Sequence, residues 1–478
     1  MKITTINRIA TLGLATLMPA ILLGQGSLTP PPHASLPANE EALDALGAPK
    51  ISMKTLAQTD PGQPIPSRDP AMVDLNGSGP EFLIKEPGHY YLTENLVGDR
   101  PIVIDSDGVT LDLRGFEIRF APSGGAGGIA ITSDIGGMTH DRITVKNGKI
   151  IGGWVEGIRL GGRSSVKDVE VSGPLTFGIY VGGTSLVEDC QVMGPGEPGE
   201  GPGPHAGIFA GDCSVITGCT ANNVHGKGIE TGNGSTIVDC TTCGNLGCGI
   251  VGLKGNTVKN STALRNGSTG IDFYAGNTIA NCNAAENGAE GFLVRSGTNL
   301  QNCVSRCNVL EGYAAVAASA ENGENQNNAV NFLQCSATEN RADGFRSDIN
   351  TLFTHCTADS NGVPGDIGDP DGPDGPGGPG SGAAVGDGFD ISEGSRMFNC
   401  VSTNNAVNGV TGARFNSVAD STIHSNGNYG LELGTTENVV VRNYIRGNGT
   451  GGINLAGGSI APFVLPSASA NALGNYSF

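Results

Sequence analysis

The chain has 478 residues, including 77 glycines, and carries a formal net charge of −19 at pH 7. A chain this acidic repels nucleic acid and anionic membranes, which excludes both as partners and makes divalent cations natural ones. Only 15% of the residues are charged, and the many Gly, Asn and Thr residues favour short strands joined by tight turns over helices.

The first 26 residues have the layout of a secretory signal peptide. Lys2 and Arg8 precede an apolar run from Ile9 to Leu23, and small residues follow it. The run is short for a membrane span, and no second long apolar run follows. We expect residues 1–26 to be removed, leaving a secreted protein (extracellular, periplasmic or on the cell surface) without a membrane span. An uncleaved anchor is the alternative.

Residues 27–80 are rich in proline and alanine, and we expect them to form a linker and an N-terminal cap. Beyond them, a glycine followed by an apolar residue recurs, and from Gly207 to Gly312 the spacing is 21 residues five times in succession. These marker glycines are Gly157, Gly178, Gly207, Gly228, Gly249, Gly270, Gly291, Gly312, Gly344, Gly388, Gly409, Gly430 and Gly452.

An asparagine lies four residues before most marker glycines: Asn245, Asn266, Asn287, Asn308, Asn340, Asn405, Asn426 and Asn448. Asparagine suits a left-handed turn position, and its amide can hydrogen-bond to the neighbour one coil away. A repeat of this length with several short strands is one coil of a β-solenoid, whose coils bury their apolar positions by stacking at ~4.8 Å. We therefore predict an all-β solenoid over residues 81–455 and a C-terminal cap over residues 456–478.

Two segments carry a family resemblance: GVTLDLRGFEI (Gly108–Ile118) and ITVKNGKIIGGWVEGIRL (Ile143–Leu160). They resemble the first coils of bacterial secreted proteins of the pectin-lyase-like superfamily, and the asparagine row is similar to the asparagine ladder of that family. The resemblance implies a single-stranded right-handed parallel β-helix with about 21 residues per coil. That fold hosts lyases, hydrolases, epimerases and adhesins, so it leaves the activity open.

Eight of the twelve cysteines share one position of the repeat: Cys190, Cys219, Cys240, Cys282, Cys303, Cys335, Cys356 and Cys400. This regular spacing predicts a buried ladder of free thiols rather than disulfides or a metal site. Cys243 and Cys248 lie off the row on one coil and could form a disulfide.

Departures from the period mark loops. The longest insertion, within residues 362–387, contains four aspartates: Asp366, Asp369, Asp371 and Asp374. A further row of carboxylates precedes four successive marker glycines: Glu290, Glu311, Asp343 and Asp387. Stacked at ~4.8 Å, these groups must stay solvated, take up protons or share a cation. We expect a calcium site formed by this row and the loop aspartates, with a solvated acidic edge as the alternative.

The residue two positions after each marker glycine should face outward. Phe209, Tyr180, Glu230, Asp272 and the nearby Tyr274 are the expected ligand-binding residues of this row, with the two aromatic rings free to stack on sugars or to pack under a loop. Arg346 and Asp390 form an ion pair in the structural interpretation. In the catalytic interpretation Arg346 or Arg295, with Asp343, Asp387 and Asp390, forms the active site.

Lyases of the family use calcium to neutralise a uronate carboxylate and a basic side chain to remove the adjacent proton, and the resemblance implies such a role for Arg346 or Arg295. The motifs of the family's hydrolases are missing. Two functions therefore stay open. The first is a secreted protein, expected to be a monomer, that binds polysaccharide or another extracellular macromolecule. The second is a calcium-dependent polysaccharide lyase or related carbohydrate-active enzyme.

Overall fold

The computed structural model describes residues 62–65, 82–99, 102–121, 128–135, 137–194, 206–317, 329–348, 350–362, 386–434, 437–455 and 476–477. The chain divides into two compact units, Met1–Asp60 and Pro61–Phe478, and every described residue belongs to the second. The predicted signal peptide, most of both predicted caps and the four loop aspartates lie outside the described residues. The described part contains no helix and therefore no helix able to cross a membrane.

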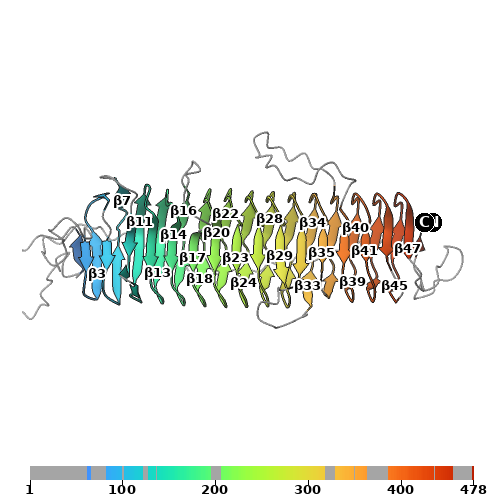
Figure 1. Cartoon of the computed structure of the whole chain (residues 1–478), viewed down its shortest axis with the longest axis horizontal. Coiled ribbons are helices and arrows are strands. Elements are labelled where there is room, and N and C mark those ends of the chain that lie inside the picture. The colour runs from blue at the N-terminus through green and yellow to red at the C-terminus, as the bar shows by residue number, and fades with distance from the viewer. Residues whose placement is uncertain are drawn as a thin grey trace, which may run out of the picture. The chain divides into compact units, whose positions relative to one another are not determined.

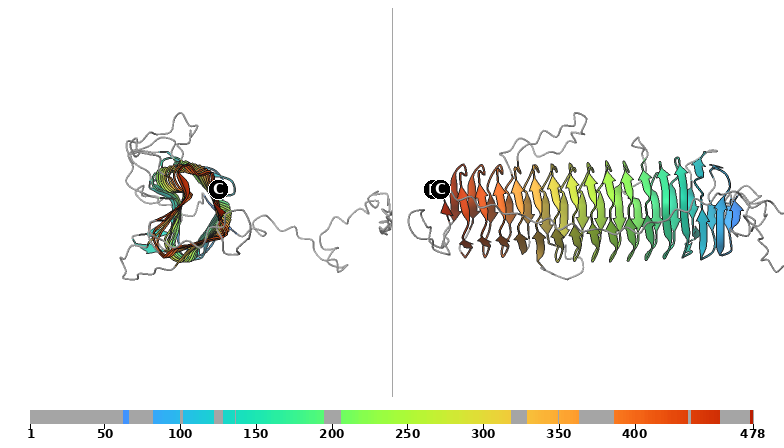
Figure 2. Two further views of the ribbon diagram at one scale, coloured as in Figure 1. Left: turned by 90° about the vertical axis from the view of Figure 1, so that its right-hand side faces the viewer. Right: turned by 180° about the vertical axis from the view of Figure 1, so that it is seen from behind.

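The second unit is a parallel β-solenoid of about 15 turns with about 21 residues per turn, as predicted (Figure 1). Seen end-on, the coils superpose around one common interior (Figure 2). Most coils add one strand to a 16-stranded sheet and two short strands to a 30-stranded sheet. A typical coil of the larger sheet contributes β21 (Thr236–Val238) and β22 (Thr241–Cys243).

The 16-stranded sheet carries the row of outward side chains and runs through the whole solenoid. Its strands are β2 (Phe82–Ile84), β5 (Ile102–Ile104), β8 (Ile129–Thr132), β12 (Glu156–Leu160), β14 (Phe177–Val181), β17 (Ala206–Ala210), β20 (Lys227–Thr231), β23 (Ile250–Gly252), β26 (Ile271–Phe273), β29 (Phe292–Arg295), β32 (Tyr313–Val316), β35 (Phe345–Ser347), β38 (Phe389–Ile391), β41 (Val410–Gly412), β44 (Tyr429–Leu433) and β47 (Gly451–Leu455).

Both ends of the solenoid recruit short strands from the segments expected to form caps. β1 (Gln63–Ile65) pairs in parallel with β3 (Gly88–Leu92). At the other end, β48 (Tyr476–Ser477) pairs in parallel with β46 (Tyr444–Arg446). These pairings occupy strand edges that would otherwise be open to other chains.

The core consists of ladders in which each residue lies above its equivalent one coil away. Ile229, Ile250 and Ile271 are paired in register, and all are fully buried. The ladder then turns aromatic, as predicted: the rings of Phe292, Tyr313, Phe345 and Phe389 stack at centroid distances of 4.7–4.8 Å. Parallel stacking at the coil spacing buries each ring against the next.

The marker glycines are required by close approach of the backbone rather than by a left-handed conformation. A Cβ atom added to Gly270 would lie 2.6 Å from the side-chain nitrogen of Asn287 and 2.8 Å from the carbonyl oxygen of Gly291. Gly270 is not among the glycines with positive φ. Any side chain here would therefore separate two coils that must touch.

The predicted asparagine ladder is confirmed, and Asn361 also belongs to it. In this interior row each Nδ2 donates to the Oδ1 of the next asparagine at 2.9–3.0 Å. The expectation that these asparagines adopt the left-handed conformation is wrong. The positive φ belongs to the residue just before each, such as Glu286 at 57° before Asn287. The chain therefore turns at the residue before the asparagine, and the side-chain amide of the asparagine points into the interior of the solenoid.

The cysteine prediction is confirmed. The eight cysteines of the row are buried and unpaired, and Cys243 and Cys248 are also free thiols. Burial and neighbouring thiols hold the pKa of Cys335 well above its usual value, so this thiol stays neutral. The row behaves as a column of small apolar side chains.

We predict that the interior asparagine ladder contributes strongly to stability. Asn287 accepts bonds from the backbone and side-chain nitrogens of Asn266, both at 3.0 Å, and Asn287→Ala leaves these buried donors unpaired. We expect a loss of about 3 kcal/mol in the free energy of unfolding, measured by urea denaturation. The matched control is Asn299→Ala, because Asn299 accepts an amide from Asn331 at 2.7 Å on the exposed surface. Equal losses in both variants would contradict this prediction.

Candidate functional site

The predicted outward row is present on the 16-stranded sheet, where strand pairing places its members one coil apart. Its described members are Arg159, Tyr180, Phe209, Glu230, Val251, Asp272, Leu293, Ala314, Arg346, Asp390, Thr411, Glu432 and Asn454. Side chains on either side of this position in each strand point into the core, because successive residues of a strand alternate. The row therefore runs along one face of the sheet and is interrupted on the surface at Ala314, which is buried.

Aromatic side chains in this row stack on one another rather than offering their faces. The rings of Tyr180 and Phe209 lie 4.7 Å apart and nearly parallel. The guanidinium of Arg159 covers the other face of Tyr180 at 4.2 Å and is itself held by Glu156 at 2.5 and 2.6 Å. Tyr180 can therefore contact a ligand through its hydroxyl and ring edge, but it has no free face for a sugar ring.

The middle of the row is occupied by ion pairs. Lys227 pairs with Glu230 at 2.6 Å, and Arg295 pairs with Asp272 at 2.7 Å. Arg295 also lies 5.3 Å from the ring of Tyr274. The structure thus brings together Arg295, Asp272 and Tyr274, with the arginine already neutralised by a neighbouring carboxylate.

Four carboxylates, those of Glu290, Glu311, Asp343 and Asp387, stack on successive coils as expected. Their backbones form a continuous ladder, since the amide after each of the first three donates to the carbonyl oxygen of the next at 2.9–3.0 Å. Asp343 Oδ1 accepts the backbone N–H of Asp387 at 2.7 Å, and Asp387 Oδ1 accepts that of Asn408 at 2.7 Å. We call Asp343, Asp387 and the adjacent Asp390 the aspartate cluster.

Arg346 pairs with carboxylates other than the one expected. Its guanidinium lies 3.1 Å from Glu311 and 3.4 Å from Asp348. Asp390 is its strand neighbour, yet no ion pair between the two is formed. Asp390 is left without the close neutralising contact that the sequence suggested, because the arginine turns toward the preceding coil.

The aspartate cluster takes up protons near neutral pH. Burial raises the pKa of Asp343 to about 7, and the like charges of Asp387 and Asp390 act in the same direction. Burial raises the pKa of Asp390 to about 6, with Asp387 adding to the effect and Arg346 opposing it. Burial also raises the pKa of Asp387. Carboxyl groups that titrate in this range can donate or accept protons at physiological pH.

The described carboxylates do not by themselves form a calcium site. Within the described ranges no group of three or more acidic, histidine or cysteine side chains is arranged to hold a metal ion. One oxygen each of Asp343 and Asp387 is already bonded to a backbone amide. The calcium site stays a prediction, since the loop aspartates that would complete it lie outside the described residues.

Sequence analysis missed a polar network at the C-terminal end of the row. Asn408 donates to Glu432 at 2.9 Å and to Thr411 at 3.1 Å, and Asn454 donates to Glu432 at 3.1 Å. Asn408 follows Asp387 in the row that precedes the marker glycines, so the repeat itself could have identified it.

Phe415 was also missed. It lies in the turn after β41, is 49% exposed, and has a left-handed φ of 58°. For a bulky residue this conformation costs on the order of 1–2 kcal/mol. Five other coils have glycine at the same repeat position: Gly234, Gly255, Gly276, Gly297 and Gly394. The sequence signal that could have identified Phe415 is an aromatic residue at a repeat position where these five coils have glycine.

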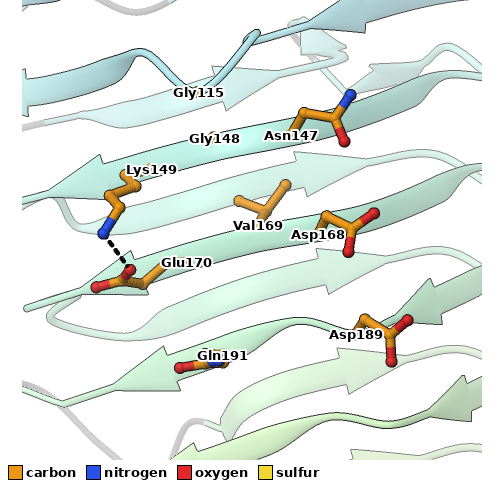
Figure 3. A pocket seen from close by; sticks show the side chains of 9 residues that line it. All are labelled: Gly115, Asn147, Gly148, Lys149, Asp168, Val169, Glu170, Asp189 and Gln191. Carbon is orange, nitrogen blue, oxygen red and sulfur yellow. Dashed lines mark ion pairs between the residues drawn. The ribbon is translucent and has the colours of Figure 1, made fainter.

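A separate shallow depression of about 390 Å³ lies on the 30-stranded sheet (Figure 3). Asn147, Asp168 and Asp189 line one side, one per coil, and Lys149 pairs with Glu170 at 2.7 Å on the other. The strands β11 (Thr144–Ile151) and β13 (Ser165–Ser172) each bend within their length, at Asn147 and Asp168. The depression forms along these bends. It is open and lies on a different sheet from the outward row.

Comparison with known proteins agrees with this architecture. The family described as "Right handed beta helix region" matches residues 177–332. Residues 177–332 therefore match a right-handed β-helix region, and the right-handed β-helix that the resemblance implied is confirmed there. No curated protein matches the sequence.

Several solved structures are similar to this chain at low identity. The periplasmic alginate epimerase AlgG is 12% identical, with a TM-score of 0.40 over 70% of this chain and 77% of its own. The A-module of the Azotobacter vinelandii mannuronan C-5 epimerase AlgE4 is 14% identical, with a TM-score of 0.35 over 79% and 91%. The Dettilon tailspike protein is 14% identical, with a TM-score of 0.37 over 77% and 62%. These likenesses concern the fold alone.

We predict that stability falls as the pH rises toward neutrality, because of the aspartate cluster. An unfolded aspartate has a pKa of about 3.9, so between about pH 4 and 7 the folded state binds more protons than the unfolded state. The contribution is complete below this window and is lost as the pH rises through about 7. We expect the melting temperature to drop by a few degrees between pH 5 and pH 8 in wild type.

The variant Asp343→Asn should flatten this pH profile, because the amide keeps the shape of the side chain but does not ionise. Asp239→Asn, at an exposed turn, serves as the control and should leave the profile unchanged. The pH profiles of both variants are measured from melting curves followed by circular dichroism at each pH. A profile in Asp343→Asn as steep as that of wild type would show that the cluster does not titrate as described.

Proposed function

We propose that the protein binds a linear polysaccharide along the outward row of the 16-stranded sheet. The observation that carries this proposal is the length of the row, which runs in register from Arg159 on β12 to Asn454 on β47 with one residue per coil, of which Ala314 is buried. The row spans about 58 Å at the coil spacing. Such a length suits a polymer with a regular repeat rather than a small molecule.

The charge of the row favours a neutral or amino-bearing polymer. From β29 to β47 the outward row and the row before the marker glycines contain one arginine, Arg346, against six carboxylates. These are Glu290, Glu311, Asp343, Asp387, Asp390 and Glu432. A polyuronate would meet like charge along this half of the sheet and would need bound cations to approach.

A second candidate function is catalysis on the bound polymer. It is favoured by the aspartate cluster, in which Asp343 has a pKa of about 7 and Asp390 one of about 6. A protonated carboxyl group and an ionised one on adjacent coils would serve as acid and base at a glycosidic bond. Arg346 would hold a negatively charged substituent. A calcium-dependent lyase reaction remains part of this candidate and depends on the calcium prediction.

Export and a monomeric state are part of the proposal. An exported monomer would present the whole row to polymers outside the cytoplasm, and the predicted signal peptide at residues 1–26 would provide the export.

The binding proposal predicts measurable affinity for soluble polysaccharides in affinity electrophoresis. The panel consists of xylan, mixed-linkage β-glucan, chitosan, alginate and polygalacturonate, and we expect retardation by one of the first three. The double variant Thr411→Ala with Asn454→Ala should weaken that binding about tenfold, as expected for two lost hydrogen bonds.

The matched control replaces the same residue types outside the row. Thr241→Ala with Asn299→Ala lies on the exposed side of the 30-stranded sheet and should leave the affinity unchanged. Wild-type protein that is not retarded by any of the five polymers would refute the binding proposal. Equal weakening by both double variants would place the binding elsewhere.

The catalytic candidate predicts chain cleavage by the same protein. Ultraviolet absorbance detects unsaturated sugar ends from a lyase, and a reducing-end assay detects hydrolysis. Calcium-dependent absorbance with polygalacturonate or alginate, lost with a chelator, would identify the lyase. Asp343→Asn should reduce either activity at least a hundredfold. No product in any assay would leave binding alone. A melting temperature unchanged by chelator would count against the calcium site.

A further inference from the structure

We propose that Phe415, with Arg414 and Glu393 beside it, is a docking point for one sugar ring at the edge of the outward row. This inference rests on the proposed polysaccharide binding and assigns part of it to a residue outside the row. Phe415 lies in the turn that follows β41, three residues after Gly412.

The backbone of Phe415 is the first observation. Its φ of 58° lies in the left-handed region, where a bulky side chain is an outlier. At Gly255 and Gly276, in the same repeat position, an added Cβ would meet no atom within 4 Å, so φ and not space favours glycine there. Some early coils tolerate other residues at this position: Arg163, Thr184 and Cys213. None of these is a large apolar side chain.

Exposure is the second observation. A single exposed apolar residue is ordinary on a protein surface. Phe415, however, is only about half buried, with 49% of it exposed, and its backbone conformation is unfavourable. The coil before it has Gly394 at the equivalent position, which provides no side chain to cover the ring. Strain that is retained at a side chain only half buried is typical of a functional position.

The surroundings of the ring indicate the class of ligand. The guanidinium of Arg414 lies 5.4 Å from the ring of Phe415 and pairs with Glu393 at 2.9 Å. Both charged side chains are largely exposed, so they can rearrange at little cost. An aromatic face packs against the apolar C–H face of a pyranose, and the adjoining guanidinium and carboxylate bind the hydroxyl groups at its edge.

This position differs from the aromatic pair in the outward row. Both faces of Tyr180 are covered, one by Arg159 and the other by Phe209. Tyr180 therefore has no free ring face for a sugar. Phe415 lies in a turn, where no aromatic residue of the described part stacks on it, and Arg414 lies over its ring at 5.4 Å. It therefore keeps more open ring surface than Tyr180 does.

The test compares Phe415→Gly with wild type, using affinity electrophoresis against xylan, mixed-linkage β-glucan and chitosan together with thermal melting. Glycine suits the left-handed turn, so the melting temperature should stay the same or rise. The affinity should fall at least tenfold. Phe415→Trp should keep the affinity within about threefold, because it preserves the aromatic face.

Leu253→Ala is the matched control, since Leu253 is 48% exposed on the same side of an earlier coil and should not affect binding. Unchanged affinity in Phe415→Gly, with wild type still binding, would overturn the docking point and leave the proposed function intact. Loss of folding in both Phe415 variants would mark the residue as structural and also overturn it. Failure of wild type to bind any of the three polymers would overturn the proposed function first.

Discussion

The close parallel stacking of coils is the constraint on which the rest of this structure depends. Coils ~4.8 Å apart leave no room for a Cβ atom at positions such as Gly270, and they bring the carbonyl oxygen of Gly291 next to that backbone. The same spacing lets Asn287 donate to Asn308 and accept from Asn266, so that buried amides satisfy one another. One geometric requirement thus selects glycine at one position and asparagine at another.

Stacking at this spacing also decides the electrostatics of the surface. At Lys149 and Glu170, and at Lys167 and Glu188, the sign of charge alternates between coils and the side chains form ion pairs. Where the sign repeats, the charges cannot move apart, because the strands fix their spacing. The aspartate cluster is the result, and its raised pKa values follow from burial together with like charges on neighbouring coils.

The register has an equally direct effect on aromatic residues. In-register rings stack on each other inside the core, as Tyr313 and Phe345 do, and also outside it, as Tyr180 and Phe209 do. Tyr180, a ring within the strand row, therefore has both faces covered by residues of adjacent coils. Phe415 lies in a turn, where no aromatic residue of the described part stacks on it. This explains why the turns that border the sheet, as well as its outward row, belong to the proposed ligand-binding surface.

The sequence by itself determined the solenoid, its period, the aromatic ladder, the interior cysteines and the asparagine row, because each is a residue type repeated at a fixed interval. Interval alone could not reveal which way a side chain turns. The left-handed residue proved to be Glu286 rather than Asn287, and Arg346 turned to Glu311 rather than to Asp390. The covered faces of Tyr180 and the protonation of Asp343 likewise depend on neighbours 21 to 44 residues away in the chain. Only the stacking of coils brings those neighbours into contact. The side-chain rotamers and the burial that result therefore cannot be predicted from the local sequence.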